Sequence, residues 1–242
     1  MDKGLNDLLK WSINASTAKE DNTGPSPTAR TPNADAIAAL LGGPSDADLM
    51  MAAMANVTST DPEITLESKL NALDNLEQLI ESLDNANLLS KLGLWTPLLE
   101  LLGHDESEIR RMAAWVVGTA VQNNAPSQER LVALGGVEKL VAMVLGERIG
   151  MEKRSGDGDV IVQDVQDAQG VNAGEQEVKD VRRKAVYALS SAVRNYQPAM
   201  DVLSSELKKR DGKETGIVEA TDMEKVDVVI DALREKVANA EK

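Results

Sequence analysis

Few side chains in this sequence have the types and spacing that catalysis or metal binding requires. His104 is the only histidine, and it lies in the short polar stretch GHDES, which is more typical of a turn than of a general base. Residues 156–164, GDGDVIVQD, space acidic side chains as a calcium loop does, but they lack its glycine and its distal glutamate. There is also no cysteine, no phosphate-binding loop and no nucleophile elbow. The sequence therefore predicts no enzyme, no metal site and no cofactor.

Residues 110–124, RRMAAWVVGTAVQNN, carry a tryptophan in an unexpected place. If this segment is a helix, its buried face has helical spacing and consists of Ile109, Met112, Ala113, Val116 and Ala120. Trp115 lies off that face, on a polar row with Arg111, Thr119 and Gln122. Tryptophan and arginine are enriched at the centres of protein interfaces, so this row is a candidate surface for binding a partner. The alternative is that Trp115 fills a gap between helices.

The composition favours a helical, acidic protein without disulfides. The 242 residues suffice for one or two domains, and with only 2% aromatic residues the core must consist mainly of aliphatic side chains and methionine. Such residues suit helices better than sheets. The net charge of −14 argues against nucleic acid or an anionic membrane as the main partner, and is compatible with a polypeptide. We recognise no signal peptide and no membrane-spanning stretch, and therefore expect a cytoplasmic protein.

The pattern of apolar residues and helix breakers divides the chain into four segments. Residues 1–44 combine a short helix with a flexible stretch rich in Ser, Thr, Asn and Pro. Helical repeats are expected over 45–146, and an inserted polar loop over 147–177. The last repeat and a C-terminal capping helix are expected over 178–242.

Capping residues predict where the helices of the body begin. Thr60, with Glu63 three residues later, predicts the start of a long helix whose leucine-rich stripe runs to Leu83. Asp105 and Glu108 have the same spacing and predict the start of the following long helix.

The sequence repeats itself at a spacing of about 40 residues. A shift of 42 residues places LGLWTPLLELL (92–102) on LGGVEKLVAMV (134–144), and it also places Leu73 on Trp115. Repeats of this length are typical of armadillo and HEAT solenoids, in which each repeat buries its apolar stripe against its neighbours. We therefore expect an all-α, armadillo-like α-solenoid of about three repeats with capping helices.

A third copy, VRRKAVYALSSAVRNY (181–196), follows Trp115 at a shift of 72 residues, which is 30 more than 42. The extra residues fall in the polar, glycine-rich segment 147–176, which we interpret as an insertion. This register places Tyr187 on Trp115 and Arg194 on Gln122. In a solenoid such a row lies on the concave surface, where partners bind.

Several stretches resemble the armadillo-type nucleotide exchange factors of heat-shock protein 70 chaperones, the family of Fes-one and the human heat-shock-protein-binding protein, and above all its cytosolic fungal branch. These stretches are LLKWSINAS (8–16), LLGGPSDADLMMAAM (40–54), the segment 66–102 with its LDNAN, RRMAAWVVGTAVQNN (110–124), the segment 181–203 and DMEKVDVVIDALRE (222–235). The resemblance implies that the solenoid embraces lobe II of the chaperone's nucleotide-binding domain and weakens ADP binding. ATP then binds, and the chaperone releases its substrate.

The resemblance also assigns residues. It places Asp84, Asn85, Ala86 and Asn87 at the chaperone, with Ala86 close to it; the alternative for the polar members is turn and capping chemistry. It further implies a substrate-release segment with Leu8, Leu9 and Trp11 as a short apolar patch; the alternative is a frayed helix without a role. The predicted partner-binding residues are Asp84, Asn85, Ala86, Asn87, Arg111, Trp115, Thr119, Gln122, Tyr187 and Arg194.

Two features depart from the family pattern. The loop at 147–176 is longer than expected, and a further repeat found in longer members is replaced by one last helix. The predicted partner is a cytosolic heat-shock protein 70, with no nucleic acid and no membrane, and a monomer is expected. The alternative function is an armadillo-type scaffold that binds another polypeptide without exchange activity; such a scaffold need not lose its partner when ATP is added.

Overall fold

The described part of the protein is helical throughout. The computed structural model describes residues 43–150, 177–212 and 218–240, and it contains no strand in these ranges. The helices are α3 (Asp46–Thr58), α4 (Leu66–Ile80), α5 (Leu83–Lys91), α6 (Trp95–Glu100), the 3-10 helix η1 (Leu101–Gly103), α7 (Ser107–Val121), α8 (Ala125–Ala133), α9 (Gly136–Val144), α10 (Lys179–Val193), α11 (Gln197–Asp211) and α12 (Met223–Asn239). The all-α prediction is therefore confirmed. None of these helices combines the length and the apolar character that a membrane crossing needs.

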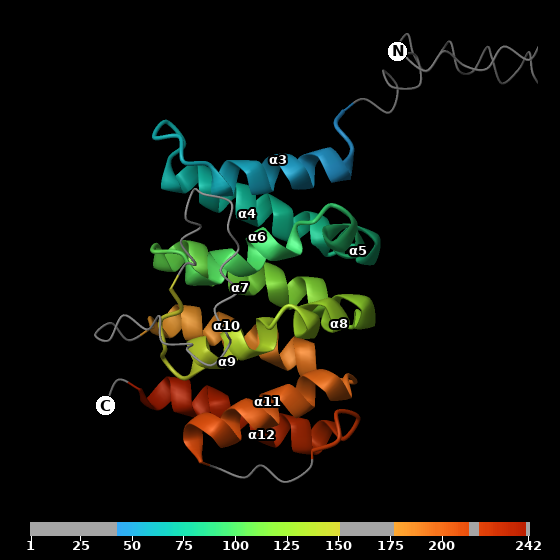
Figure 1. Ribbon diagram of the computed structural model, residues 1–242, viewed down its shortest axis with the longest axis vertical. Helices are drawn as coiled ribbons and strands as arrows, with labels where there is room; N and C mark the ends of the chain where they lie inside the picture. Colours follow the sequence, from blue (N-terminus) through green and yellow to red (C-terminus); the bar gives the residue numbers. More distant parts are fainter. Residues whose placement is uncertain (1–42, 151–176, 213–217, 241–242) are drawn as a thin grey trace, which may run out of the picture. The chain divides into compact units, whose positions relative to one another are not determined.

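The helices of the unit Asp46–Lys242 stack in chain order (Figure 1). Helix α3 packs on α4, α4 on α7, α7 on α10, and α10 on α12, so one long helix follows another along the stack. The shorter helices α5 and α8 contact each other beside this row, as do α8 and α11. This arrangement is that of an α-solenoid, and the number of repeats stays a prediction.

Two asparagines confirm the register between the second and third copies of the repeat. Asn123 and Asn195, which are 72 residues apart, have positive φ angles of 52° and 57°. Asparagine tolerates this left-handed conformation better than most residues. Each asparagine ends a long helix, and proline lies in the first turn of the helix that follows, α8 or α11. The two copies therefore turn in the same way at the same position.

Helices α7 and α10 approach each other closely at Gly118. A Cβ atom added there would lie 2.5 Å from Cε1 of Tyr187 and 3.1 Å from the Cα of Ala188. Contacts below 3.0 Å are not tolerated between carbon atoms, so only glycine allows this approach. The position of the Tyr187 ring therefore depends on the missing side chain at residue 118.

A buried ion pair joins the start of α7 to the chain just before α10. The Arg110 guanidinium donates from Nε to Glu177 Oε2 (2.7 Å) and from Nη2 to Glu177 Oε1 (2.8 Å), and Arg110 is only 1% exposed. Its Nη1 donates to the carbonyl oxygens of His104 and Asp105. The Glu177 amide donates to the carbonyl of Gly146 at 3.0 Å. The chain therefore returns at Glu177 to the point where it left α9.

Buried polar side chains also cap the end of α10. Gln128 in α8 donates from Nε2 to the carbonyl oxygens of Ser191, Ala192 and Arg194 at 3.0 to 3.1 Å. The last carbonyls of a helix have no partner within the helix, so this amide stabilises the end of α10 and fixes α8 against it.

The helix starts differ from those predicted. Helix α4 begins after Thr65, whose hydroxyl accepts from the Ser68 amide, whereas Thr60 lies in a preceding turn. The N-cap of α7 is Glu106, and no side chain caps it, so the predicted capping by Asp105 is wrong. The long leucine-bearing helix ends at Ile80 rather than continuing to Leu83.

We predict that Glu177→Ala strongly destabilises the fold. The substitution leaves the buried Arg110 charge without its carboxylate, and breaking a buried pair in this way costs about 3 to 5 kcal/mol. Urea unfolding followed by circular dichroism measures the loss. Arg234→Ala, which breaks the exposed pair with Asp231, is the matched control and should cost less than about 1 kcal/mol. Equal effects of the two variants would contradict a structural role for the buried pair.

We also predict that Gly118→Val destabilises the protein by about 1 to 3 kcal/mol, because it forces side-chain atoms into a filled contact. The matched control is Ala232→Val, at an exposed position of α12. Unfolding free energies of both variants are measured under the same conditions. An unchanged stability of Gly118→Val would show that α7 and α10 can separate without cost.

Candidate partner-binding site

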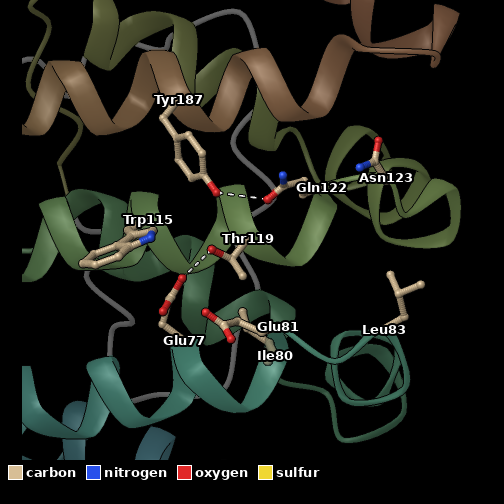
Figure 2. A pocket seen from close by; sticks show the side chains of 9 residues that line it. All are labelled: Glu77, Ile80, Glu81, Leu83, Trp115, Thr119, Gln122, Asn123 and Tyr187. Carbon is tan, nitrogen blue, oxygen red and sulfur yellow. Dashed lines mark hydrogen bonds between the residues drawn. The ribbon is translucent and has the colours of Figure 1, made fainter.

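A depression on one face of the stack is lined by side chains of α4, α7 and α10, by the first residue of α5, and by the residues that directly follow α4 and α7. Its lining consists of Glu77, Ile80, Glu81, Leu83, Trp115, Thr119, Gln122, Asn123 and Tyr187 (Figure 2). Three successive long helices thus contribute to one surface, as the repeat register predicts for a polar row. We call this surface the α4–α7–α10 face.

Hydrogen bonds cross from each helix of the α4–α7–α10 face to the next (Figure 2). The Thr119 hydroxyl on α7 donates to Glu77 Oε1 on α4 at 2.7 Å, and the Glu77 residue is buried. The Tyr187 hydroxyl on α10 donates to Gln122 Oε1 at 3.3 Å. The polar row therefore has a structural role as well as an exposed surface, because it joins neighbouring helices.

Trp115 lies half-buried on the α4–α7–α10 face, in contact with a cation. The Lys184 Nζ atom is 3.6 Å from the centroid of the Trp115 ring and 5.7 Å from that of Tyr187, close enough for a cation–π interaction with both. Burial lowers the pKa of Lys184, the nearby Arg111 lowers it further, and Glu77 opposes the shift. Trp115 also packs against the core, so both readings of this residue, gap filling and partner contact, are compatible with its position.

Five of the predicted residues come together here. Arg111, Trp115, Thr119, Gln122 and Tyr187 all lie on α7, at its end, or on α10, and all but Arg111 line the depression. Their gathering follows from the close packing of α7 on α10.

Arg194 lies apart from the depression and contacts α12. Its guanidinium donates from Nη2 to Asp227 Oδ1 and from Nε to Ser190 Oγ. Its Nη1 approaches the sulfur of Met223 at 3.5 Å. Arg194 therefore joins α10 to α12, as Gln122 joins α7 to α10 one copy earlier, and a role in partner binding stays a prediction.

The LDNAN segment forms the first turn of α5. Asn85 is buried and donates from Nδ2 to Asp46 Oδ2 (2.8 Å) and to the carbonyl of Leu79 (2.9 Å). Ala86 is 1% exposed and belongs to the core, Asn87 is half-buried, and Asp84 is exposed. Ala86 therefore offers a partner almost no surface in this conformation.

Sequence reasoning missed six residues of this region, namely Glu77, Ile80, Glu81, Leu83, Asn123 and Lys184. Leu83, which the leucine pattern assigned to a buried stripe, is 55% exposed and lines the depression. Glu77 precedes Thr119 by the 42-residue repeat and could have been found from that shift, whereas Glu81 has no such signal. Lys184 is placed by a contact between helices and follows from no pattern in the sequence.

The remaining predicted sites have different outcomes. Leu8, Leu9 and Trp11 lie outside the described residues. His104 lies in the turn before α7, where its Nδ1 accepts from the Glu106 amide at 3.0 Å, and burial lowers its pKa. Within the three ranges that the structure describes, no group of three or more His, Cys, Asp or Glu side chains could hold a metal ion.

The sequence of the chain is similar to those of proteins of one family. The family described as "Nucleotide exchange factor Fes1" matches residues 5–89. The chain is 50% identical to the "Hsp70 nucleotide exchange factor FES1" of Gibberella zeae over 240 residues, which cover 99% of both chains. It is 46% identical to "Hsp70 nucleotide exchange factor fes-1" of Neurospora crassa, across 99% of this chain and 100% of that one.

A third relative, the protein of Coccidioides immitis with the same name as that of Gibberella zeae, is 42% identical across 97% of this chain and 99% of its own. Identity at this level over nearly whole chains leaves no alternative to common descent. The chain belongs to the Fes1 family of Hsp70 nucleotide exchange factors.

Proposed function

We propose that this protein is a nucleotide exchange factor that binds the nucleotide-binding domain of a cytosolic Hsp70, promotes ADP release and so promotes release of the bound substrate. The observation that carries the proposal is the 50% identity, over 99% of both chains, to a protein named as an Hsp70 nucleotide exchange factor. The protein acts in the cytoplasm, as a monomer, and as a co-chaperone instead of as an enzyme.

The α4–α7–α10 face is the proposed contact with lobe II of that domain. Its Trp115 and Tyr187 rings are half-buried, and hydrogen bonds across the helices hold its polar side chains in place. Aromatic side chains fixed in this way lose little conformational entropy on binding, which is what makes them strong anchors at interfaces. Leu83 adds an exposed apolar group, and the exposed Asp84 extends the surface to α5.

Exchange follows from linkage between the two ligands of the chaperone. If the factor binds the chaperone more tightly when ADP is absent, ADP binding and factor binding weaken each other by the same factor. ATP binding to the chaperone must then release the factor. A scaffold whose binding is independent of nucleotide would show no such release, so this property separates the proposal from the scaffold alternative.

The segment with Leu8, Leu9 and Trp11 has a separate proposed role. Its three apolar side chains occur in a polar surrounding sequence and offer a short patch that could occupy a site for apolar peptides. In the proposal this patch competes with the chaperone's substrate, while the helical stack acts on the nucleotide.

We predict that the protein accelerates release of a fluorescent ADP analogue from cytosolic Hsp70 when ATP is added as a chase. Trp115→Ala should weaken binding to the chaperone about 30-fold, as expected for loss of an interface anchor worth about 2 kcal/mol. Release rates are measured across a range of factor concentrations. Arg130→Ala, at an exposed position of α8 outside the α4–α7–α10 face, is the control and should behave as the wild type.

Circular dichroism and urea unfolding must show that the Trp115→Ala variant is folded, because the ring also packs against the core. A folded variant with full activity would exclude Trp115 from the interface. A wild-type protein that stays bound to the chaperone in ATP and does not change the release rate would instead support the scaffold function.

For the N-terminal patch we predict different effects on ADP release and on peptide release from the chaperone. Replacing Leu8, Leu9 and Trp11 together by Ala should leave ADP release unchanged and slow the dissociation of a labelled peptide from the chaperone. Replacing the nearby polar residues Ser12, Asn14 and Ser16 by Ala serves as the control. Unchanged peptide dissociation in the apolar variant would leave the segment without a role in substrate release.

A further inference from the structure

Two basic side chains lie close together at the edge of the α4–α7–α10 face. Lys184 on α10 places Nζ over the Trp115 ring, and Arg111 precedes Trp115 by one helical turn on α7, so both cations neighbour the same ring. The charge of Arg111 also lowers the pKa of Lys184. Two like charges that approach each other in a partly buried site repel, and this repulsion costs free energy unless an opposite charge lies between them. We call Arg111 and Lys184 the cationic pair.

No carboxylate among residues 43–150, 177–212 and 218–240 forms an ion pair with either member of the cationic pair. Two arginines near the cationic pair in the sequence do have carboxylate partners: Arg183 of α10 pairs with Asp180, and Arg194, which follows α10, pairs with Asp227.

Glu77 is the carboxylate whose charge acts on Lys184, but it does not compensate the pair. Its Oε1 accepts a hydrogen bond from the Thr119 hydroxyl, which holds the carboxylate towards α7. It lies beyond the distance of an ion pair from both cations. Arg111 and Lys184 therefore have no ion-paired carboxylate within the described residues.

We propose that the cationic pair receives a carboxylate from an acidic side chain on the partner's surface, and that this ion pair sets the rate and the orientation of docking. The identity of that partner, the nucleotide-binding domain of Hsp70, rests on the proposed function. Lys184 is already held by the Trp115 ring, so forming the ion pair immobilises little that was free.

The charge distribution across the depression also fixes the direction of docking. The cationic pair lies on α7 and α10 and does not line the depression, whereas the exposed Glu81 lines it at the end of α4. A partner whose acidic group meets the cationic pair therefore presents a neutral or basic group to Glu81. The reversed orientation would place like charges together, which is how charged groups at an interface exclude wrong arrangements.

The test measures the association rate of the full-length protein with the isolated nucleotide-binding domain of Hsp70 at increasing salt. Lys184→Gln and Arg111→Gln should each lower the association rate about 3- to 10-fold at low salt, and the difference should vanish near 0.5 M salt, where charges are screened. Lys139→Gln on α9 removes the same charge away from the α4–α7–α10 face and is the matched control. It should change the rate less than about twofold.

The outcomes separate this proposal from the proposed function. Equal association rates for wild type and both variants at low salt would overturn the cationic pair, even if ADP release is accelerated. A loss on Lys184→Gln that persists at high salt, without a loss on Arg111→Gln, would show that Lys184 only positions Trp115, and would also overturn the proposal.

If the wild-type protein binds the domain without accelerating ADP release, the exchange function is overturned. The association rates of the variants then still decide whether the cationic pair is the docking site. A wild-type protein that does not bind the domain at all would overturn both. Salt-dependent losses on both variants, with Lys139→Gln unchanged, would establish the cationic pair as a docking site for an acidic group.

Discussion

The contact between α7 and α10 is the packing interaction on which the binding face depends. Gly118 lets the Tyr187 ring lie against α7, and this places Tyr187 next to Gln122 and Lys184 next to Trp115. A side chain at residue 118 that pushed the two helices apart would disrupt both of these contacts. The surface of the protein at this point is therefore a consequence of core packing, and a change in the core at residue 118 is a change in the face.

That contact has to form although a long segment separates the two helices in the sequence. Bringing the ends of such a segment together costs chain entropy, which grows slowly with its length. The structure offsets this cost at the site of closure: the Glu177 amide meets the Gly146 carbonyl, and the Glu177 carboxylate meets Arg110 inside the core. Because Arg110 also holds the carbonyls of His104 and Asp105, the same side chain fixes the start of α7.

The sequence predicts the features that follow from the spacing of its repeats. It misses features for which two nearby residues could play the same part, and features that depend on a contact between helices far apart in the chain. Repeat spacing aligns Asn123 with Asn195, and the structure gives both the same rare backbone conformation. Thr60 and Thr65 both offer a capping hydroxyl, and in the structure it is the Thr65 hydroxyl that accepts from the Ser68 amide and begins α4. Lys184 could not have been placed at all, because its position is set by an aromatic ring on another helix, far away in the chain.

The contacts that join neighbouring long helices bear on the proposed function. A factor that weakens nucleotide binding must spend part of its binding free energy on displacing a lobe of its partner, since a ligand shifts an equilibrium only by its differential affinity for the two states. A face that deformed on contact would absorb that free energy itself. Here Thr119 binds Glu77, Tyr187 binds Gln122, and Arg194 binds Asp227, so each long helix from α4 to α12 is tied to the next. Under the proposed function, these contacts between the helices favour a change of shape in the partner over a change of shape in this face.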